Sequence, residues 1–472
     1  MAETIAKVNP LGTEKVGRLM VRFAVPSIIA MLVNSLYNMV DQVFIGQGVG
    51  YLGNAATSII LPLSIALMAI GLMIGDGAAT FMSLKLGMGE KKTAAHGVGN
   101  AIVMIVIASI AMTLVCLAFL EPLCRLFGAT DAVLPYALDF GFVMVLGFLF
   151  GAICCGFGGV IRADGRPNIT MIGLLMGFAV NIILNPLFIF VCGWGVTGSA
   201  LATVTGQGLN AAFFAVCMFR FKTIKLDASS FILRPRICGR ILALGFSSFI
   251  AQIVTVAVIF VMNNLLVRYG GLSEYGSDIP LAAYGVAVKV SYLLTGIALG
   301  LAVGVQPILG YNYGSRQYAR VKRTFKLALF WSAVVCTVGF VVFQTWPEQI
   351  SSLFDTESDL YAEFAVKCFR ICMLLCFTIG PGMVSGIFFQ AIGKPVQAAI
   401  LTLSRQAVFL IPMATIFCSF LGVEGVLWAS PFSDLAACIM GLIMVRAYWN
   451  RLFREDSTEQ EPRRRSVGEE LS

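Results

Sequence analysis

Polar side chains recur at helical spacing in three apolar stretches of the first half of the chain. They are Asn34, Tyr37, Asn38 and Asp41 in the first stretch, Asn181 and Asn185 in the second, and Ser199, Thr203 and Gln207 in the third. Because residues at i, i+4 and i+7 lie on one face of a helix, each group predicts one polar stripe. A single carboxylate among amides and hydroxyls forms a hard-oxygen site, which suits H⁺ or Na⁺. Hydrogen bonding between packed helices, without transport chemistry, is the alternative.

The second half of the chain carries a different polar set. Lys289, Arg405 and Asp434 are charged residues within apolar stretches, and Gln306 lies in such a stretch too. A charge at the centre of a membrane helix costs about 2.5 to 3.5 kcal/mol, so each needs a partner, water or a function. We expect a substrate cavity with Arg405, Asp434 and Gln306 among its polar contacts, and a structural ion pair between Arg405 and Asp434 is the alternative. The other cavity candidates are Asn34, Tyr37, Asn38, Gln207 and Lys289.

The composition indicates which elements position these residues. Of the 472 residues, 58% are hydrophobic and 12% are charged, and the mean hydropathy is +0.88. These values exclude a soluble domain, and a membrane helix needs about 20 apolar residues. The predicted spans are 19–46, 54–83, 97–120, 133–159, 168–191, 197–219, 238–267, 281–310, 327–346, 361–390, 395–420 and 423–446. The sequence therefore predicts an all-α polytopic membrane protein with twelve transmembrane helices.

The distribution of basic residues indicates the orientation of the spans. The chain has 33 Lys and Arg residues and a net charge of +8, and 27 of the basic residues fall in the two tails and the even-numbered loops. Only Arg125 and Arg268 fall in the opposite loops. By the positive-inside rule both termini are cytoplasmic, so the charge reflects orientation and not a nucleic-acid partner. We expect a multi-pass membrane protein.

The two halves of the chain resemble each other at an offset of about 225 residues. The turn at 162–167 matches 390–395, and Gly71 and Gly75 match Gly296 and Gly300. Because each repeat holds an even number of spans, both begin on the same side of the membrane. The predicted parts are an N-terminal lobe at 1–228, a C-terminal lobe at 229–450 and a disordered cytoplasmic tail at 451–472. The mixed charges of the last segment are typical of a solvated extension.

Motifs of enzyme chemistry are absent from the sequence. It contains no H-E-x-x-H, no G-x-S-x-G and no P-loop, and its sole histidine, His96, lies in a predicted loop. We therefore expect a protein that is not an enzyme, with no catalytic residue and no cofactor. An intramembrane enzyme is a remote alternative.

Three segments resemble the multidrug and toxic compound extrusion (MATE) family in its DinF-like bacterial branch. They are the run from Gly12 through Pro26 to Gly46, the turn at 162–167, and Asn181 to Pro186. The resemblance covers all twelve spans and implies a location in the plasma (bacterial inner) membrane. It implies two six-helix lobes around a V-shaped cleft, through which amphipathic or cationic compounds leave the cell in exchange for H⁺ or Na⁺.

The resemblance also implies which residues bind the coupling cation. Asp41, Asn181 and Thr203 match the family's positions on the first, fifth and sixth helices, so a Na⁺ ion, if used, would bind there. Some relatives have an Asp where this chain has Asn185, which we keep as a fourth coupling residue. No other metal is expected.

The predicted function is secondary active multidrug efflux by a monomer in the bilayer, with small amphipathic or cationic substrates. A flippase for lipids or lipid-linked sugars, from the same superfamily, is the alternative. Such a protein would use cationic residues such as Lys289 and Arg405 to hold a pyrophosphate.

Two further residues have predicted roles in the coupling machinery or beside it. Pro26 lies 15 residues before Asp41. Because proline removes one backbone hydrogen bond, Pro26 is predicted to be a hinge of the first span. Asp76, toward the cytoplasmic end of the second span, is predicted to be structural, since an acid there can reach interfacial water.

Overall fold

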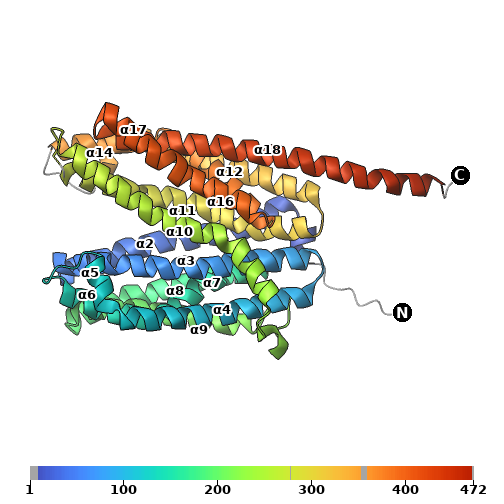
Figure 1. The fold of residues 1–472 in the computed structure, drawn as a ribbon, viewed down its shortest axis with the longest axis horizontal. Coiled ribbons are helices and arrows are strands. Elements are labelled where there is room, and N and C mark those ends of the chain that lie inside the picture. The colour runs from blue at the N-terminus through green and yellow to red at the C-terminus, as the bar shows by residue number, and fades with distance from the viewer. Residues whose placement is uncertain (1–8, 277, 352–358, 470–472) are drawn as a thin grey trace.

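The computed structural model describes residues 9–276, 278–351 and 359–469. Every regular element in this part of the chain is a helix, and the long helices run side by side along the long axis of the molecule (Figure 1). A bilayer core offers no water to backbone groups, so a chain this apolar satisfies its N–H and C=O groups within helices. Helix α2 starts and helix α18 ends at the same end of the bundle, which we name the terminal end (Figure 1).

The helices form two groups, the lower and upper halves of Figure 1. The N-terminal lobe contains α2 (Val16–Gly48), α3 (Tyr51–Gly87), α4 (Lys91–Ala118), α5 (Leu120–Leu126), α6 (Leu134–Leu146), α7 (Phe148–Ala163), α8 (Pro167–Pro186), the π-helical segment η1 (Leu187–Val191) and α9 (Gly195–Met218). The C-terminal lobe contains α10 (Pro235–Gly270), α11 (Asp278–Gly314), α12 (Tyr318–Thr345), α13 (Pro347–Ser351), α14 (Asp359–Cys372), η3 (Cys376–Thr378), α15 (Ile379–Ala391), α16 (Pro395–Leu403), the π-helical segment η4 (Ser404–Leu410), α17 (Ile411–Leu421) and α18 (Glu424–Glu469). Two short helices, α1 (Pro10–Thr13) and η2 (Ala228–Phe231), lie outside these groups.

The number of spans agrees with the sequence prediction. Among the described residues, 10 helices are long and apolar enough to cross a membrane. Two pairs, Leu134–Leu146 with Phe148–Ala163 and Leu360–Cys372 with Cys376–Ala391, qualify together and bend by 53° and 41°. Counting each pair as one span gives 12, so the prediction of an all-helical polytopic membrane protein is confirmed. The two bends lie about 227 residues apart, so the bend itself is part of the repeat.

Helix α2 is shared between the two lobes. Near the terminal end, Met20 and Ala24 are buried in a core cluster that otherwise consists of C-terminal residues such as Phe325. Farther along the helix, Asp41 contacts α8 and α9 of the N-terminal lobe. Pro26 lies inside the helix, and the contact with the C-terminal lobe continues past it, since Gly300 of α11 lies against Ile28.

Helix α10, the first helix of the C-terminal half, is likewise shared between the two lobes. Its first part contributes Ile241 to the core of the N-terminal lobe, whereas Met262, farther along, belongs to the core of the C-terminal lobe. Gly245 lies against the backbone carbonyl of Met73 on α3, where a Cβ atom would overlap that oxygen. The first helix of each half therefore packs its terminal-end part against the other half.

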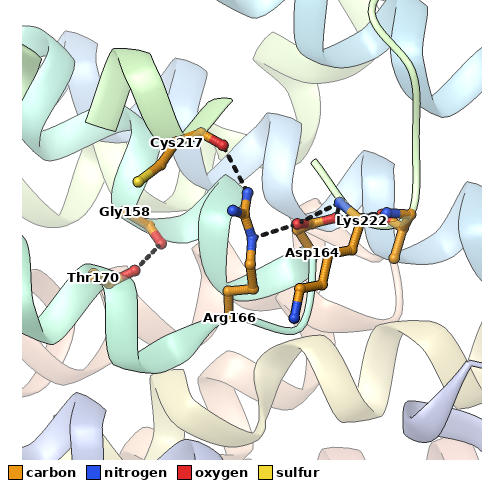
Figure 2. Close-up of polar contacts among 7 residues, drawn as sticks. Gly158, Asp164, Arg166, Thr170, Cys217 and Lys222 are labelled. Carbon is orange, nitrogen blue, oxygen red and sulfur yellow. Dashed lines mark hydrogen bonds and ion pairs between the residues drawn. The ribbon is translucent and has the colours of Figure 1, made fainter. Parts of the chain in front are cut away.

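The connection between the lobes, residues 219–234, is fixed to the N-terminal lobe at both of its ends. Figure 2 shows the first attachment, around the fully buried carboxylate of Asp164. This carboxylate accepts hydrogen bonds from the backbone N–H groups of Lys222 at 3.1 Å and Thr223 at 2.9 Å, and it pairs with Arg166 at 2.6 Å. Arg166 in turn donates to the carbonyl of Cys217 at 2.8 Å. The turn at 162–167 thus serves as an anchor for the connection.

The second attachment is Asn100 on α4, which is fully buried. Its amide nitrogen donates to the carbonyls of Ser230 at 3.1 Å and Ile232 at 2.9 Å, and its oxygen accepts from the N–H of Arg234 at 2.7 Å. Helix α10 starts at the next residue, Pro235, so it begins from a fixed point on the N-terminal lobe.

The C-terminal tail differs from the sequence prediction. We expected a disordered extension at 451–472, whereas helix α18 continues through Glu469, and 470–472 lie outside the described residues. The sequence places Glu459 and Glu461 four residues before Arg463 and Arg465. This spacing supports a helix, because oppositely charged residues at i and i+4 are neighbours on its surface.

Candidate functional site

Asp41, a residue of α2, faces α8 and α9 and accepts hydrogen bonds from two neutral side chains. The amide nitrogen of Asn185 donates to Oδ1 at 2.6 Å, and the hydroxyl of Ser199 donates to the same oxygen at 3.2 Å. Asn185 and Ser199 are completely buried. Within the described part of the chain, no lysine or arginine forms an ion pair with Asp41. Among the described residues, neutral dipoles therefore stabilise the carboxylate.

The same three helices also bring together Tyr37, Asn181 and Thr203. Each of these residues lies one helical turn from the residue that its helix contributes at Asp41. Thr203 accepts hydrogen bonds from the hydroxyl of Tyr37 at 3.0 Å and from the amide nitrogen of Asn181 at 3.2 Å. The ring of Tyr37 also packs edge-on against Phe178, with centroids 6.3 Å apart. Three of the predicted coupling residues and one predicted cavity residue thus belong to one two-layered cluster with Asp41.

Two amide oxygens of this cluster have no hydrogen-bond partner among the described residues. They are Oδ1 of Asn181 and Oδ1 of Asn185, both buried. A buried acceptor without a donor costs about 1 to 3 kcal/mol. A cation bound beside Asp41 would satisfy such oxygens, since carboxylate and amide oxygens are the ligands that hard cations prefer. The residues present therefore fit either a proton on Asp41 or a Na⁺ ion held by Asp41, Asn181 and Asn185, with Thr203 next to them.

Asp434, an acid within a candidate membrane span of the C-terminal lobe, has a different kind of partner. The guanidinium Nε of Arg405 lies 2.8 Å from Oδ1 of Asp434, and the side chains are 34% and 10% exposed. Arg405 lies in the π-helical segment η4 and Asp434 in α18. The sequence left open whether Arg405 and Asp434 form an ion pair, and the structure shows that they do. The two charges compensate each other, so the pair does not offer a free carboxylate for a coupling cation.

The remaining predicted cavity residues do not join one site. Lys289 is exposed and donates to the side-chain oxygen of Gln42 at 3.4 Å. Gln306 is buried and donates to the hydroxyl of Thr80 at 3.2 Å, so it bridges α11 and α3. Gln207 is half-buried on α9, with its amide oxygen beside Gly151 of α7. Asn34 lies on the exposed side of α2, and the side chain of Asn38 lies outside the described part of the structure.

A second contact between the lobes joins Asp76 to residues that the sequence did not assign. Ser248 on α10 donates to the carboxylate of Asp76 at 2.7 Å, and Gln390 on α15 donates to Ser248 at 2.9 Å. Arg162 interacts electrostatically with the same carboxylate. We predicted that Asp76 would reach interfacial water, but it faces the other lobe. The sequence repeat could have indicated this contact, because Arg162 and Gln390, which both take part in it, occupy equivalent positions in the two halves.

Two similar helical lobes, with polar and charged groups inside apolar spans, are an architecture that is typical of membrane transporters. The family model described as MatE matches residues 26–187 and 246–416, which is most of both lobes. The chain belongs to this family, whose full name is multidrug and toxic compound extrusion.

Relatives with curated names have the same length as this chain to within a few per cent. The chain is 26% identical over 438 residues to the multidrug export protein MepA of Staphylococcus haemolyticus, with 92% of this chain and 94% of that protein aligned. It is also 26% identical over 435 residues to MepA of Staphylococcus aureus strain MSSA476, with the same coverage.

Solved structures share the fold. A multidrug resistance MATE family transporter in an outward-facing conformation superposes with a TM-score of 0.88 at 23% identity, covering 94% of this chain and 99% of that one. A MOP superfamily transporter from Pyrococcus furiosus superposes with a TM-score of 0.87 at 23% identity, covering 93% and 97%.

Proposed function

We propose that the protein is a secondary active transporter that exports small amphipathic or cationic compounds and takes up H⁺ or Na⁺ in exchange. The observation that carries this proposal is the carboxylate of Asp41, which lies among neutral donors and unpartnered amide oxygens. Family membership and the multidrug export function named for the relatives support the substrate class. The coupling ion is the only cofactor that the mechanism uses.

The shared helix α2 connects ion binding to the arrangement of the lobes. One part of α2 is packed in the C-terminal lobe through Met20 and Ala24, and the other holds Asp41 in the N-terminal lobe. Pro26 lies between them and lacks the N–H of a normal helical residue, which allows the helix to bend there. A cation on Asp41 removes or balances its charge, so it changes which bend of α2 is favoured. Export follows if cation and substrate favour different states, because a ligand that binds both states equally shifts neither.

The orientation forms part of the proposal. The terminal end would face the cytoplasm of a bacterial cell, because the basic residues gather in the tails and in the loops of that side. The native Cys192 is exposed in the loop between α8 and α9 and can serve as a reporter. A protein with Cys192 as its only cysteine should react with an impermeant maleimide added to intact cells. A protein whose only cysteine replaces Lys222 should react only after the cells are opened, and reaction from outside would reverse the orientation.

The flippase alternative receives less support from the charged residues. Arg405 is paired with Asp434, so its charge is already balanced in this conformation. Lys289 then remains as the one uncompensated cation of the pair that the flippase alternative would use.

Transport by the purified protein in liposomes tests the function and identifies the ion. An inward-directed pH gradient and an inward-directed Na⁺ gradient are imposed separately on vesicles loaded with a cationic dye, and dye release is measured. Release driven by either gradient, and lost in Asp41→Asn, supports the proposal. Gradient-independent release, or movement of a labelled lipid instead of the dye, would overturn it.

A further inference from the structure

Helix α3 packs backbone to backbone against two helices of the C-terminal lobe near the terminal end. A Cβ atom added at Gly77 of α3 would overlap the carbonyl oxygen of Ile241 on α10. A Cβ atom added at Gly87, at the end of α3, would overlap the carbonyl oxygen of Tyr311 on α11. Glycine allows such an approach because it has no Cβ atom. The two lobes are therefore closed against each other at this end.

Asp76 lies in the same part of α3 and is approached by polar side chains from both lobes. Ser248 of α10 donates to its carboxylate at 2.7 Å, and Gln390 of α15 donates to Ser248 at 2.9 Å. On the side of the N-terminal lobe, a Cβ atom added at Gly159 would lie 3.5 Å from the carboxylate and 3.6 Å from the guanidinium of Arg162. We name Arg162, Asp76, Ser248 and Gln390 the interlobe cluster, which connects helices α7, α3, α10 and α15.

The two bent spans contribute equivalent residues to the interlobe cluster. Arg162 is the last residue but one of α7, and Gln390 is the last residue but one of α15. These helices are the second limbs of the two bent pairs, and the turns that follow them are equivalent in the two repeats. Two equivalent positions can approach one carboxylate only near the axis that relates the repeats. The interlobe cluster therefore lies at the centre of the interface between the lobes and not at its edge.

The interlobe cluster lies inside the membrane spans, away from the charged loops. Asp76 precedes Gly87, the end of its span, by about 16 Å at the rise of an α-helix. Between these two positions Gln306 of α11 donates to Thr80 of α3 at 3.2 Å. A carboxylate at this depth needs a partner, because a charge inside a span is costly. Its partners therefore affect which arrangement of the lobes is stable.

The direction of the hydrogen bonds gives Ser248 a particular role. A serine hydroxyl has one hydrogen to donate, and the amide of Gln390, by donating to the oxygen, leaves that hydrogen for Asp76. Arg162 and Asp76 belong to the same lobe, whereas Ser248 belongs to the other. If the lobes separate, Asp76 keeps Arg162 and exchanges Ser248 for water. The closed arrangement thus gains the bond from Ser248, and the open one stays accessible because the carboxylate is still compensated.

We propose that the interlobe cluster is a latch that holds the lobes closed at the terminal end and opens once in each transport cycle. The inference rests on the proposed function, because transport requires the site to open to each side in turn. Ser248 is a positioning residue, since it acts through Asp76 and lies outside the site around Asp41. The latch sets the fraction of molecules that are open at the terminal end. In the proposed orientation substrate enters from this side, so that fraction also sets its apparent affinity.

A thiol buried between the lobes can report their separation. Ser83 on α3 is 3% exposed, and a Cβ atom added at Gly310 of α11 would lie 2.9 Å from its Cβ atom. Ser83→Cys therefore places a thiol inside the closed contact. The purified full-length protein in detergent is treated with N-ethylmaleimide, and peptide mass spectrometry follows labelling at residue 83 alone, so the native cysteines stay in place. The exposed Cys192 of the same sample is the reference for the reagent.

Three variants are compared in this background. Ser248→Ala removes the donor that the C-terminal lobe supplies, and Gln390→Leu removes the group that orients Ser248. Thr255→Ala is the matched control. Thr255 lies two helical turns from Ser248 on α10 and also accepts from a glutamine, Gln406 at 3.4 Å, but its own hydroxyl donates within the same helix. The control thus removes a similar hydroxyl without changing the contact between the lobes.

Loss of the latch should raise the labelling rate at residue 83. Ser248→Ala should raise it about tenfold, the equivalent of about 1.4 kcal/mol, because a hydrogen bond to a charged group is lost in the closed state only. Gln390→Leu should raise it about threefold, and Thr255→Ala should leave it unchanged. Gln390→Leu, on another helix, decides the matter if Ser248→Ala fails to fold. Equal rates in all the proteins would overturn the proposal, and so would an equal rise in Thr255→Ala, since α10 would then have loosened as a whole.

The labelling experiment needs neither a gradient nor a substrate, so its result is separate from that of the transport assay. Faster labelling in Ser248→Ala, together with no dye release from liposomes, would leave the closed contact in place and refute the proposed transport. Coupled dye release with unchanged labelling in Ser248→Ala and Gln390→Leu would refute the latch alone.

Discussion

Asp41 in the N-terminal lobe and Asp434 in the C-terminal lobe are both acids inside candidate membrane spans, but their partners differ. Asp41 accepts hydrogen bonds from Asn185 and Ser199, whereas Asp434 pairs with Arg405 at 2.8 Å. A carboxylate among neutral donors can still gain a proton or a metal ion at moderate cost. A carboxylate beside a guanidinium must first lose that partner, which leaves a buried charge uncompensated. Two repeats of one fold thus place their acids in different surroundings.

The largest expected effect comes from removing the charge of Asp41. In Asp41→Asn, the amide keeps the shape of the side chain and still accepts from Asn185, but it can neither take up a proton nor balance Na⁺. Gradient-driven efflux from liposomes should fall to the level of vesicles without protein, whereas the thermal unfolding midpoint should stay within a few degrees of the unmodified protein. If the variant still pumps at the unmodified rate, Asp41 is structural and the coupling acid must be sought elsewhere in the chain.

The second prediction concerns the ion pair. Arg405→Ala leaves the largely buried Asp434 carboxylate without its partner, and we expect a loss of about 2 kcal/mol in the free energy of unfolding. This is less than for a fully buried pair because Arg405 is 34% exposed. The double variant Arg405→Leu with Asp434→Leu should recover most of that stability, as measured by unfolding in detergent. If Arg405 instead binds substrate, Arg405→Ala would leave the stability unchanged and would shift the profile of exported drugs.

Smaller effects are expected for the neutral members of the N-terminal cluster. Asn181→Ala and Thr203→Ala each remove one polar group beside Asp41 and leave its charge in place. We expect coupled efflux to fall by about threefold to tenfold, because one hydrogen bond contributes about 1 kcal/mol. Thr203→Ser, which keeps the hydroxyl that accepts from Tyr37 and Asn181, should retain most activity. A complete loss in Thr203→Ser would show that packing, and not the hydroxyl, is the requirement.

The smallest effect is expected at the bend of α2. Pro26→Ala restores a backbone N–H inside α2, between the part that holds Met20 and Ala24 and the part that holds Asp41. We expect efflux to slow by about twofold, since alanine stiffens the hinge and leaves Asp41 intact. Helix α10 passes between the lobes at Gly245 without a proline, so it provides the comparison. An unchanged rate in Pro26→Ala would place the bending of α2 elsewhere.

The sequence predicted the spans and the polar stripes well, because both depend on local patterns. Twelve apolar segments and the spacing of Asn181, Asn185, Ser199 and Thr203 follow directly from hydropathy and helical periodicity. The tail was predicted less well, since low hydropathy alone does not distinguish a disordered segment from a solvent-exposed helix. The surroundings of Asp76 were predicted wrongly, because its partner Ser248 lies on another helix, 172 residues away in the chain.

The sequence by itself determined that this is a helical membrane protein of two repeated halves and that Asp41 shares a helix face with other polar groups. Only the tertiary structure decided which faces meet. Asn185 and Ser199 reach Asp41 from 144 and 158 residues away, and Arg405 reaches Asp434 from 29. Periodicity fixes the direction of a side chain around its own helix, but the neighbour on that side depends on how all the helices pack. The partner of each buried acid, and with it the difference between the two lobes, is therefore a property of the folded molecule.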